Sequence, residues 1–517
     1  MVFPENFLWG VSLSGFQFEM GDPFRRGLDP NTDWYVWVHD ERNIREGIVS
    51  GDFPEDGVDY WHRYKADHEM AKGLGLNVFR IGLEWSRIFP KSTHSVDAGL
   101  ELADDGNACK IEVDERSIEE LEKFADNDAV NHYRRIIENL RETGFKVFVC
   151  LNHFTLPLWI HNPIVLREKG FRRGPSGWLD RTSIIEFVKY AAYIAWKLGD
   201  IVDYWATFNE PMVVSEAGYL TVESGFPPGV RNFRAYRKAS VNIALAHARA
   251  YDAIKKWDTV KADYESHSPA EVGIIHNLIP VEPFSDNSAD ASAAKAMDFM
   301  HNHYFLRAVT MGPLKFRADS GNKDAKAYMR ERMDWLGVNY YTRFVVKGKR
   351  SLLARLALGV PSQPELMPGY GFACEPNSTS RGQLPTSDFG WEIYPNGLIE
   401  VLRQVRDYGK PIYVTENGVA DAKDMLRPKF LLDHLKAVDE AINRDKIDVR
   451  GYMHWSLMDN YEWARGFKMR FGLYAVDSKS KERIPRKSAE VYRRIVESGD
   501  VEKVNAVCRI IEEKTIF

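Results

Sequence analysis

Short apolar runs alternate along the chain with longer segments whose apolar residues keep helical spacing. Runs of the first kind predict buried strands, and spacing of the second kind predicts amphipathic helices. Trp61, Tyr64, Ala71 and Leu74 form one such helical stripe, and Gly75 closes it as a helix cap. The expected strands are residues 7–12, 77–85, 145–153, 201–206, 272–277, 335–341, 411–415 and 449–455. A strand and then a helix, repeated eight times, predicts an α/β fold of one (β/α)₈ TIM barrel.

Several connections are too long for plain loops, and we interpret them as insertions in a single barrel domain that covers residues 1–517. They lie near residues 92–128, 154–180 and 343–390. Residues 21–57 are rich in Pro, Gly and aromatic side chains, which predicts a long loop. A doubly wound open sheet is the alternative fold. The absence of a glycine-rich phosphate loop after the first strand disfavours it.

Polar side chains gather where the expected strands end. In a barrel of this kind the catalytic groups lie at the carboxyl ends of the strands. One polar strand end is usually a solvated cap, but so many at one rim predict a site. The residues read off these ends are Gln17, Arg80, His153, Asn209, Glu210, Asn339, Tyr341, Glu416 and Trp455.

Two of these strands deliver a carboxyl group. Glu210 follows the apolar run 201–206 and precedes Pro211, while Glu416 follows the run 411–415. A carboxylate at the end of a buried strand is poorly hydrated, and poor hydration raises its pKa. A pair of carboxyl groups placed in this way suits acid/base and nucleophilic chemistry on an acetal.

The motifs around these glutamates carry a resemblance to a known family. Asn209-Glu210-Pro211, Thr415-Glu416-Asn417-Gly418 and the N-terminal Phe7-Leu8-Trp9-Gly10 resemble glycoside hydrolase family 1, the retaining β-glycosidases, in its archaeal form. The motifs at residues 459–463 and 471–473 match the same family. The resemblance extends from about residue 3 to residue 493, and it implies a (β/α)₈ barrel.

The resemblance also implies roles for individual residues. Glu416 becomes the nucleophile, supported by Arg80 and Tyr341, and Glu210 becomes the general acid and then the general base. A retaining mechanism places the two carboxyl groups about 5–5.5 Å apart. Asn209 donates to the sugar 2-hydroxyl. The other residues expected to bind substrate are Gln17, His153, Asn339, Tyr341, Trp455, Glu462 and Trp463.

The expected activity is exo-hydrolysis of terminal β-glycosyl residues through a covalent glycosyl-enzyme. The substrates are small β-glycosides or oligosaccharides of glucose, galactose or mannose. A preference for β-mannosides is the main alternative, because residues 152–157 resemble the β-mannosidase branch. Phe154 stands where the family usually has tryptophan. A non-catalytic sugar-binding barrel is the alternative from another class, and the presence of both glutamates argues against it.

Charge and metal ligands exclude other functions. The formal net charge is −5 over 517 residues, which does not suit a nucleic-acid partner. His301-Asn302-His303 could suggest a metal-dependent hydrolase, but no third ligand is evident, so we interpret it as a helix surface. We expect no metal and no cofactor.

The remaining expectations concern location and assembly. The four cysteines are widely spaced, which favours free buried thiols in a reducing compartment. The N-terminus does not resemble a signal peptide and no apolar run reaches transmembrane length, so we expect a cytoplasmic protein without a membrane partner. A charged fraction of 28% is compatible with a hot habitat. The family resemblance implies a homo-oligomer, either a dimer or a tetramer.

Overall fold

The fold is a closed barrel of eight parallel strands, seen in a computed structural model that describes residues 2–171, 173–264, 266–317 and 325–506. Neighbouring strands follow the order β1-β13-β12-β9-β7-β6-β5-β2. The barrel strands are β1 (Leu8–Ser12), β2 (Val78–Gly82), β5 (Lys146–Cys150), β6 (Tyr204–Asn209), β7 (Glu271–Asn277), β9 (Leu336–Tyr340), β12 (Ile412–Asn417) and β13 (Val449–His454). All eight expected strands are therefore confirmed, each within a few residues of its expected ends.

The barrel closes by pairing its first strand with its last. Leu8 of β1 lies opposite Gly451 of β13, and on the other edge Gly10 of β1 lies opposite Val78 of β2. The hydroxyl of Tyr492, on the C-terminal helix, donates to the backbone oxygen of Gly10 at 2.8 Å. The strands β1 and β13 and the helix that carries Tyr492 thus meet at one seam.

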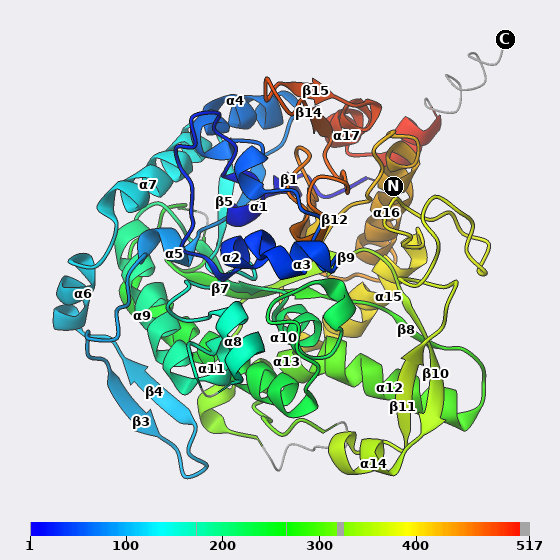
Figure 1. Ribbon diagram of the computed structural model, residues 1–517. Coiled ribbons are helices and arrows are strands. Elements are labelled where there is room, and N and C mark those ends of the chain that lie inside the picture. Colours follow the sequence, from blue (N-terminus) through cyan, green and yellow to red (C-terminus); the bar gives the residue numbers. More distant parts are fainter. Residues whose placement is uncertain (1, 172, 265, 318–324, 507–517) are drawn as a thin grey trace.

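An outer ring of helices surrounds the strands (Figure 1). One helix follows each strand as the (β/α)₈ pattern requires. These helices are α4 (Tyr60–Gly73), α7 (Asn127–Glu142), α9 (Arg181–Leu198), α11 (Phe233–Trp257), α13 (Tyr304–Thr310), α15 (Pro395–Val405), α16 (Arg427–Asn443) and α17 (Lys487–Ser498). The main hydrophobic core lies between this ring and the strands, and a smaller cluster fills the barrel interior.

Packing inside the barrel depends on one close approach. The ring of Trp335 enters the interior beside Phe148 and Tyr413, with ring centroids 5.1 and 5.7 Å away. A Cβ atom on Gly273 would lie 2.2 Å from the Trp335 ring, so only glycine fits there. Gly273 on β7 therefore makes room for a large side chain in the interior layer.

The βα connections contain further α-helices and strands, so they build up the end of the barrel where the barrel strands finish. The short helices there are α1 (Gly15–Phe18), α2 (Asp33–His39), α3 (Glu41–Arg45), α5 (Trp85–Ile88), α6 (Glu115–Glu122), α8 (Pro163–Lys169), α10 (Pro211–Tyr219), α12 (Ser288–Asp298) and α14 (Leu352–Leu358). The small sheets comprise β3 (Gly99–Leu102) with β4 (Ala108–Glu112), β8 (Val281–Pro283) with β10 (Phe344–Arg350) and β11 (Ser362–Leu366), and β14 (Tyr474–Val476) with β15 (Arg483–Pro485).

Two sequence expectations about these connections need correction. Residues 21–57 are not a plain loop, because α2 and α3 form there, each begun by a side-chain cap from Thr32 or Asp40. A composition rich in Pro and Gly hid these caps. Cys109 and Cys374 are free thiols but only half buried, while Cys150 is fully buried. Cys508 lies outside the described residues.

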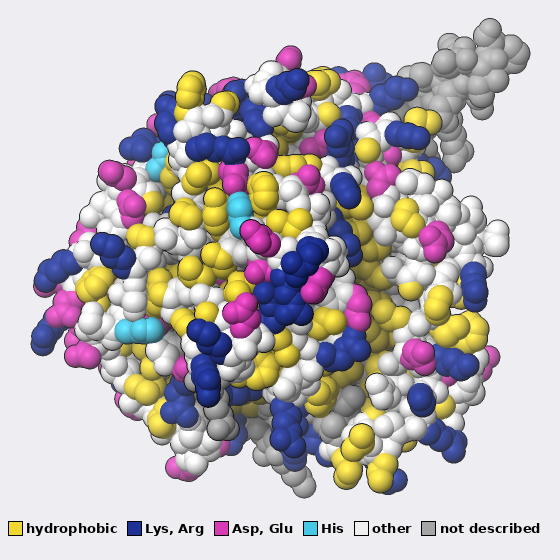
Figure 2. Space-filling model, in the orientation of Figure 1, with side chains coloured by type: hydrophobic (Ala, Val, Ile, Leu, Met, Phe, Trp, Pro, Cys, Tyr) yellow, Lys and Arg dark blue, Asp and Glu magenta, His cyan; other side chains and the backbone are white. Residues whose placement is uncertain are grey.

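The surface carries mixed charge and one apolar projection. Figure 2 shows lysine and arginine interspersed with aspartate and glutamate, and hydrophobic side chains exposed at its lower edge, over α14. Leu352, Leu353 and Leu356 of α14 are each more than 60% exposed. Within the described ranges, none of the helices combines the length and the apolar character that crossing a bilayer requires.

Candidate active site

The two glutamates come from strands on opposite sides of β9 and β7. Glu210 directly follows β6 and begins α10, with Pro211 in the first helical position. Its backbone is left-handed, with φ of 49° and ψ of 59°, which is a strained conformation for a residue with a side chain. Glu416 lies on β12, in register with Asn339 on β9. The strand-to-helix turn at Glu210 thus aims a carboxyl group at the mouth of the barrel.

Both glutamates line one pocket of about 610 Å³ at this end of the barrel. The same pocket is lined by most of the residues that the sequence predicted, namely Gln17, His153, Asn209, Tyr341, Trp455, Glu462 and Trp463. Arg80 and Asn339 do not line it. They lie fully buried behind the glutamates and hold them by hydrogen bonds. The sequence therefore identified residues of one connected site.

Glu416 is held by two donors, one on each oxygen. Arg80 Nη1 donates to Oε1 at 2.5 Å, and the Tyr341 hydroxyl donates to Oε2 at 2.6 Å. A guanidinium and a hydroxyl both favour the ionised carboxylate. Burial and the Glu416 charge raise the pKa of Tyr341 well above its usual value, so the phenol keeps the proton that it donates. Glu416 is thus arranged as an anion.

Glu210 is arranged to hold a proton. Burial, and then the negative charge of Glu416, raise the pKa of Glu210 to about 7. Asn339 Nδ2 and Asn277 Nδ2 donate to its Oε1 at 2.7 and 3.2 Å and partly oppose this rise. Among the described residues, no donor contacts Oε2. That oxygen is therefore left for a proton and for the atom that receives it.

Arg80 also organises the residues beside the glutamates. Its Nη2 donates to Asn209 Oδ1 at 2.9 Å and contacts His153 Nδ1 at 3.2 Å. Asn209 Nδ2 in turn lies 3.3 Å from His153 Nε2. Burial and the Arg80 charge hold the pKa of His153 well below its usual value, so the imidazole is neutral. Asn209 and His153 are fixed in one orientation before any ligand arrives.

The far wall of the pocket combines a carboxyl group with flat aromatic rings. Gln17 Nε2 donates to Glu462 Oε2 at 3.2 Å, and burial followed by the charge of Glu416 raises the pKa of Glu462 to about 8. Phe154 packs against Trp463 with ring centroids 5.0 Å apart. Such a wall offers hydrogen bonds to hydroxyl groups and apolar faces to C–H groups.

Sequence reasoning missed several residues of this site, and three of them form hydrogen bonds there. Asn277, which donates to Glu210, ends the expected fifth strand, so the strand-end rule would have found it. Glu216 and His301 line the pocket, and Glu216 Oε2 lies 2.7 Å from His301 Nδ1. No sequence motif indicated that either residue belongs to the site. The expectation that His301-Asn302-His303 is a helix surface is wrong. His301 and Asn302 are 2% and 0% exposed, because a π-helical turn directs them inward.

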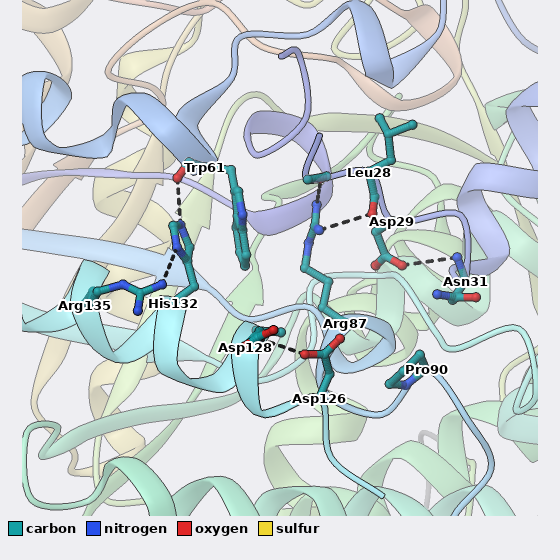
Figure 3. A pocket seen from close by; sticks show the side chains of 12 residues that line it. Leu28, Asp29, Asn31, Trp61, Arg87, Pro90, Asp126, Asp128, His132 and Arg135 are labelled. Atoms are coloured by element: carbon teal, nitrogen blue, oxygen red, sulfur yellow. Dashed lines mark hydrogen bonds between the residues drawn. The ribbon is translucent and has the colours of Figure 1, made fainter. Parts of the chain in front are cut away.

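A second hollow of about 310 Å³ lies outside the barrel, among α4, α5 and α7 (Figure 3). Arg87 covers one face of the Trp61 ring and His132 stacks on it at 4.0 Å, so the ring is not available to a ligand. Arg87 donates to Glu19 at 2.6 Å and to the backbone oxygen of Gly27 at 2.7 Å. Arg87 and His132 are therefore engaged by neighbouring groups of the protein.

One cluster within the described ranges has the geometry of a metal site. It comprises Asp22, Asp59 and His62, away from the ends of the barrel strands. Asp22 accepts from Arg26 at 2.8 Å, and Asp59 accepts from Arg63 at 3.3 Å. These cations already neutralise the carboxylates. The cluster therefore gives no support to a metal-dependent hydrolase.

Comparison with known proteins relates this chain to one family over most of its length. The family model described as glycosyl hydrolase family 1 matches residues 1–104 and 122–501. The unmatched residues 105–121 fall inside the insertion predicted near 92–128, and they comprise β4 and all of α6 but its last residue. A β-galactosidase of Pyrococcus woesei is 49% identical over 510 residues, which cover 97% of this chain and 98% of that protein.

Solved structures agree in fold. The β-glycosidase of the hyperthermophile Thermosphaera aggregans superimposes with a TM-score of 0.88 at 43% identity, covering 98% of this chain and 99% of that one. A mutant β-glucosidase, described as derived from a hyperthermophilic tetrameric structure, reaches 0.85 at 42% identity, covering 98% of each chain.

Proposed function

The chain belongs to glycosyl hydrolase family 1 and is a β-glycosidase; from this premise we propose that it is an exo-acting, retaining enzyme that works by double displacement. One observation carries the proposal. Glu210 and Glu416 line the same pocket, and their surroundings favour opposite protonation states. When the surroundings of two carboxyl groups favour opposite protonation states, the protonated group can act as the acid and the ionised group as the nucleophile.

In the first step, Glu416 attacks the anomeric carbon and forms an ester with it. Glu210 gives its proton to the departing glycosidic oxygen, so the leaving group departs as a neutral alcohol. Esterification removes the Glu416 charge, which is one of the causes that raise the pKa of Glu210. Glu210 then acts as a base, takes a proton from water, and the hydroxide replaces Glu416 at the anomeric carbon.

The other pocket residues hold the sugar in this proposal. Asn209, which Arg80 and Asn339 orient, donates to the 2-hydroxyl. Gln17, His153 and Glu462 bind the remaining hydroxyls, while Trp455 and Trp463 supply apolar faces. Terminal glucose, galactose and mannose are the proposed sugars. A preference for β-mannosides stays the alternative. Mannose carries an axial 2-hydroxyl, so the surroundings of Asn209 decide between the two.

The test is the Glu416→Gln variant, assayed on nitrophenyl β-glucoside, β-galactoside and β-mannoside. We expect the variant to keep its circular dichroism spectrum and to lose turnover on all three. A near-parental rate would refute the assignment of Glu416. The ratio of kcat/KM values of the unmodified enzyme on the three substrates gives the preferred sugar.

We further propose that residues 1–517 form one catalytic domain and that the enzyme is a homo-oligomer. The described residues form one barrel, and a similar mutant β-glucosidase is described as derived from a hyperthermophilic tetrameric structure. Light scattering coupled to gel filtration tests the assembly, and a monomer mass at micromolar concentration would refute it. The expected cytoplasmic location stays a prediction.

A further inference from the structure

A π-helical turn brings a histidine into the barrel beside the acid/base glutamate. The turn covers Phe299–His303, between α12 and α13. Turns of this kind are rare and often mark functional sites. The backbone oxygen of His301 accepts from His276 Nε2 at 2.9 Å, and the side chain of Asn302 binds both backbone groups of Ile279. The turn is thus fixed to the segment that ends β7.

From this turn a chain of hydrogen bonds leads to Glu210. Glu216 Oε2 lies 2.7 Å from His301 Nδ1, and His301 Nε2 lies 3.2 Å from Asn277 Oδ1. Asn277 Nδ2 donates to Glu210 Oε1 at 3.2 Å. Glu216 belongs to α10, the helix that Glu210 begins. The chain therefore starts and ends on one element and passes through β7 and the π turn.

The partners of His301 require a proton on both ring nitrogens. A carboxylate accepts at Nδ1 and a carbonyl oxygen accepts at Nε2, so both nitrogens donate. The titratable groups that face His301 are Glu216 on α10, Glu210 after β6, Asp298 at the end of α12, and His276 on β7. Burial disfavours the imidazolium, but the charge and hydrogen bond of Glu216, followed by Glu210, outweigh it and raise the pKa of His301.

The protonated ring decides which end of the Asn277 amide faces Glu210. While His301 Nε2 donates to the carbonyl oxygen, the NH₂ group must point to Glu210. Asn339 shows the same design, because the Thr415 hydroxyl donates to its carbonyl at 2.8 Å while its NH₂ group serves Glu210. Without the His301 donor, Asn277 could turn over and accept a hydrogen bond from protonated Glu210.

We propose that His301, held by Glu216, is a positioning residue that fixes the Asn277 amide with its NH₂ toward Glu210 and so favours the ionised, general-base form of Glu210. The inference rests on the proposed function, because it concerns the second step, in which Glu210 takes a proton from water. It predicts that loss of the His301 donor strengthens the hold of Glu210 on its proton and slows deglycosylation.

The experiment compares His301→Leu, His301→Gln and Glu216→Gln by pH profiles. Leucine removes the donor, while glutamine keeps an N–H near the position of Nε2. The alkaline limb of kcat/KM, which reports the protonated form of Glu210, is expected to move up by about 0.5–1 pH unit in His301→Leu and by less in Glu216→Gln. It is expected to stay near the parental position in His301→Gln. The kcat on a dinitrophenyl glycoside is expected to fall about tenfold in His301→Leu.

His303→Leu is the matched control. His303 lies on the same turn but contacts Tyr408 and Asp298, so its loss is expected to leave the limb in place. Two results would overturn the proposal. One is a lower kcat in His301→Leu with the alkaline limb of kcat/KM unshifted, and the other is a shift of that limb in His301→Gln as large as in His301→Leu. If His301→Leu does not fold, the pH profiles of Glu216→Gln and His301→Gln are compared instead. A shifted alkaline limb in Glu216→Gln and an unshifted one in His301→Gln support the proposal, and equal limbs in the two variants overturn it. The proposed function is tested separately in the parental enzyme, by trapping a glycosyl-enzyme with a 2-fluoro glycoside before any variant is measured.

Discussion

Because the pKa of Glu210 is raised in the folded protein, the free energy of unfolding depends on pH through the protonation of this residue. In the unfolded chain a glutamate titrates at about 4.3, and in the folded protein Glu210 titrates at about 7 because of burial and the Glu416 charge. Below pH 4 both states hold the proton and the group contributes nothing. Between those values the unfolded state ionises while the folded state does not, so stability falls as pH rises. Above pH 7 the loss is complete.

The size of this loss follows from the two pKa values. The pKa values of Glu210 in the folded and unfolded states differ by about 2.7 units, and each unit corresponds to about 1.36 kcal/mol of unfolding free energy. The total loss is therefore about 3–4 kcal/mol, of which about 3 kcal/mol is lost between pH 5 and pH 9. Glu210→Gln removes the titration but can still accept from Asn277 and Asn339. At roughly 2.1 cal/mol/K of unfolding entropy per residue, the variant should gain about 2–3 °C in Tm over the parent as pH rises from 5 to 9.

The assay is differential scanning fluorimetry of parent and variant at one scan rate and one guanidinium concentration, at pH 5, 7 and 9. Glu119→Gln, at an exposed position on α6, is the control and should track the parent at every pH. An equal Tm difference between parent and Glu210→Gln at pH 5 and pH 9 would refute the reasoning, because it would show that Glu210 is not held protonated. Glu462 titrates in both proteins, but in Glu210→Gln it lacks the Glu210 charge, which is one of the causes that raise its pKa.

Three further predictions concern activity. The kcat/KM of the parent should fall as pH rises through about 7, because the first step needs Glu210 protonated; a flat profile to pH 9 would contradict this. Glu210→Ala should lose at least a hundredfold on alkyl β-glycosides but spare the first step with dinitrophenyl glycosides, which need little protonation, and azide should restore turnover; equal losses on both would count against Glu210 as the acid. Arg80→Lys should lower kcat/KM by about ten- to a hundredfold while KM changes little, because one ammonium group cannot serve both Glu416 and Asn209 and a charge-assisted hydrogen bond contributes about 1.5–3 kcal/mol; a loss below fivefold would argue against this role.

The sequence predicted the barrel and the pair of glutamates because both leave local signals. Eight apolar runs with helical stripes between them define the strands, and Glu210 and Glu416 stand at strand ends within short motifs. Residues that act from a distance left no such signal. His301 reaches the site through a π turn, which helical periodicity cannot indicate, and Glu216 looks like an ordinary helix residue. The helices α2 and α3 were missed because two capping side chains outweigh a composition typical of loops.

The seam between β1 and β13 has a consequence for synthesis. The first strand of the barrel to be translated, Leu8–Ser12, finds one of its two neighbours only when Val449–His454 has been made, more than four hundred residues later. Until then one edge of the growing sheet has no partner strand, and unpaired edges of this kind promote aggregation. Chaperone demand during translation should therefore depend on how quickly the last fifth of the chain emerges.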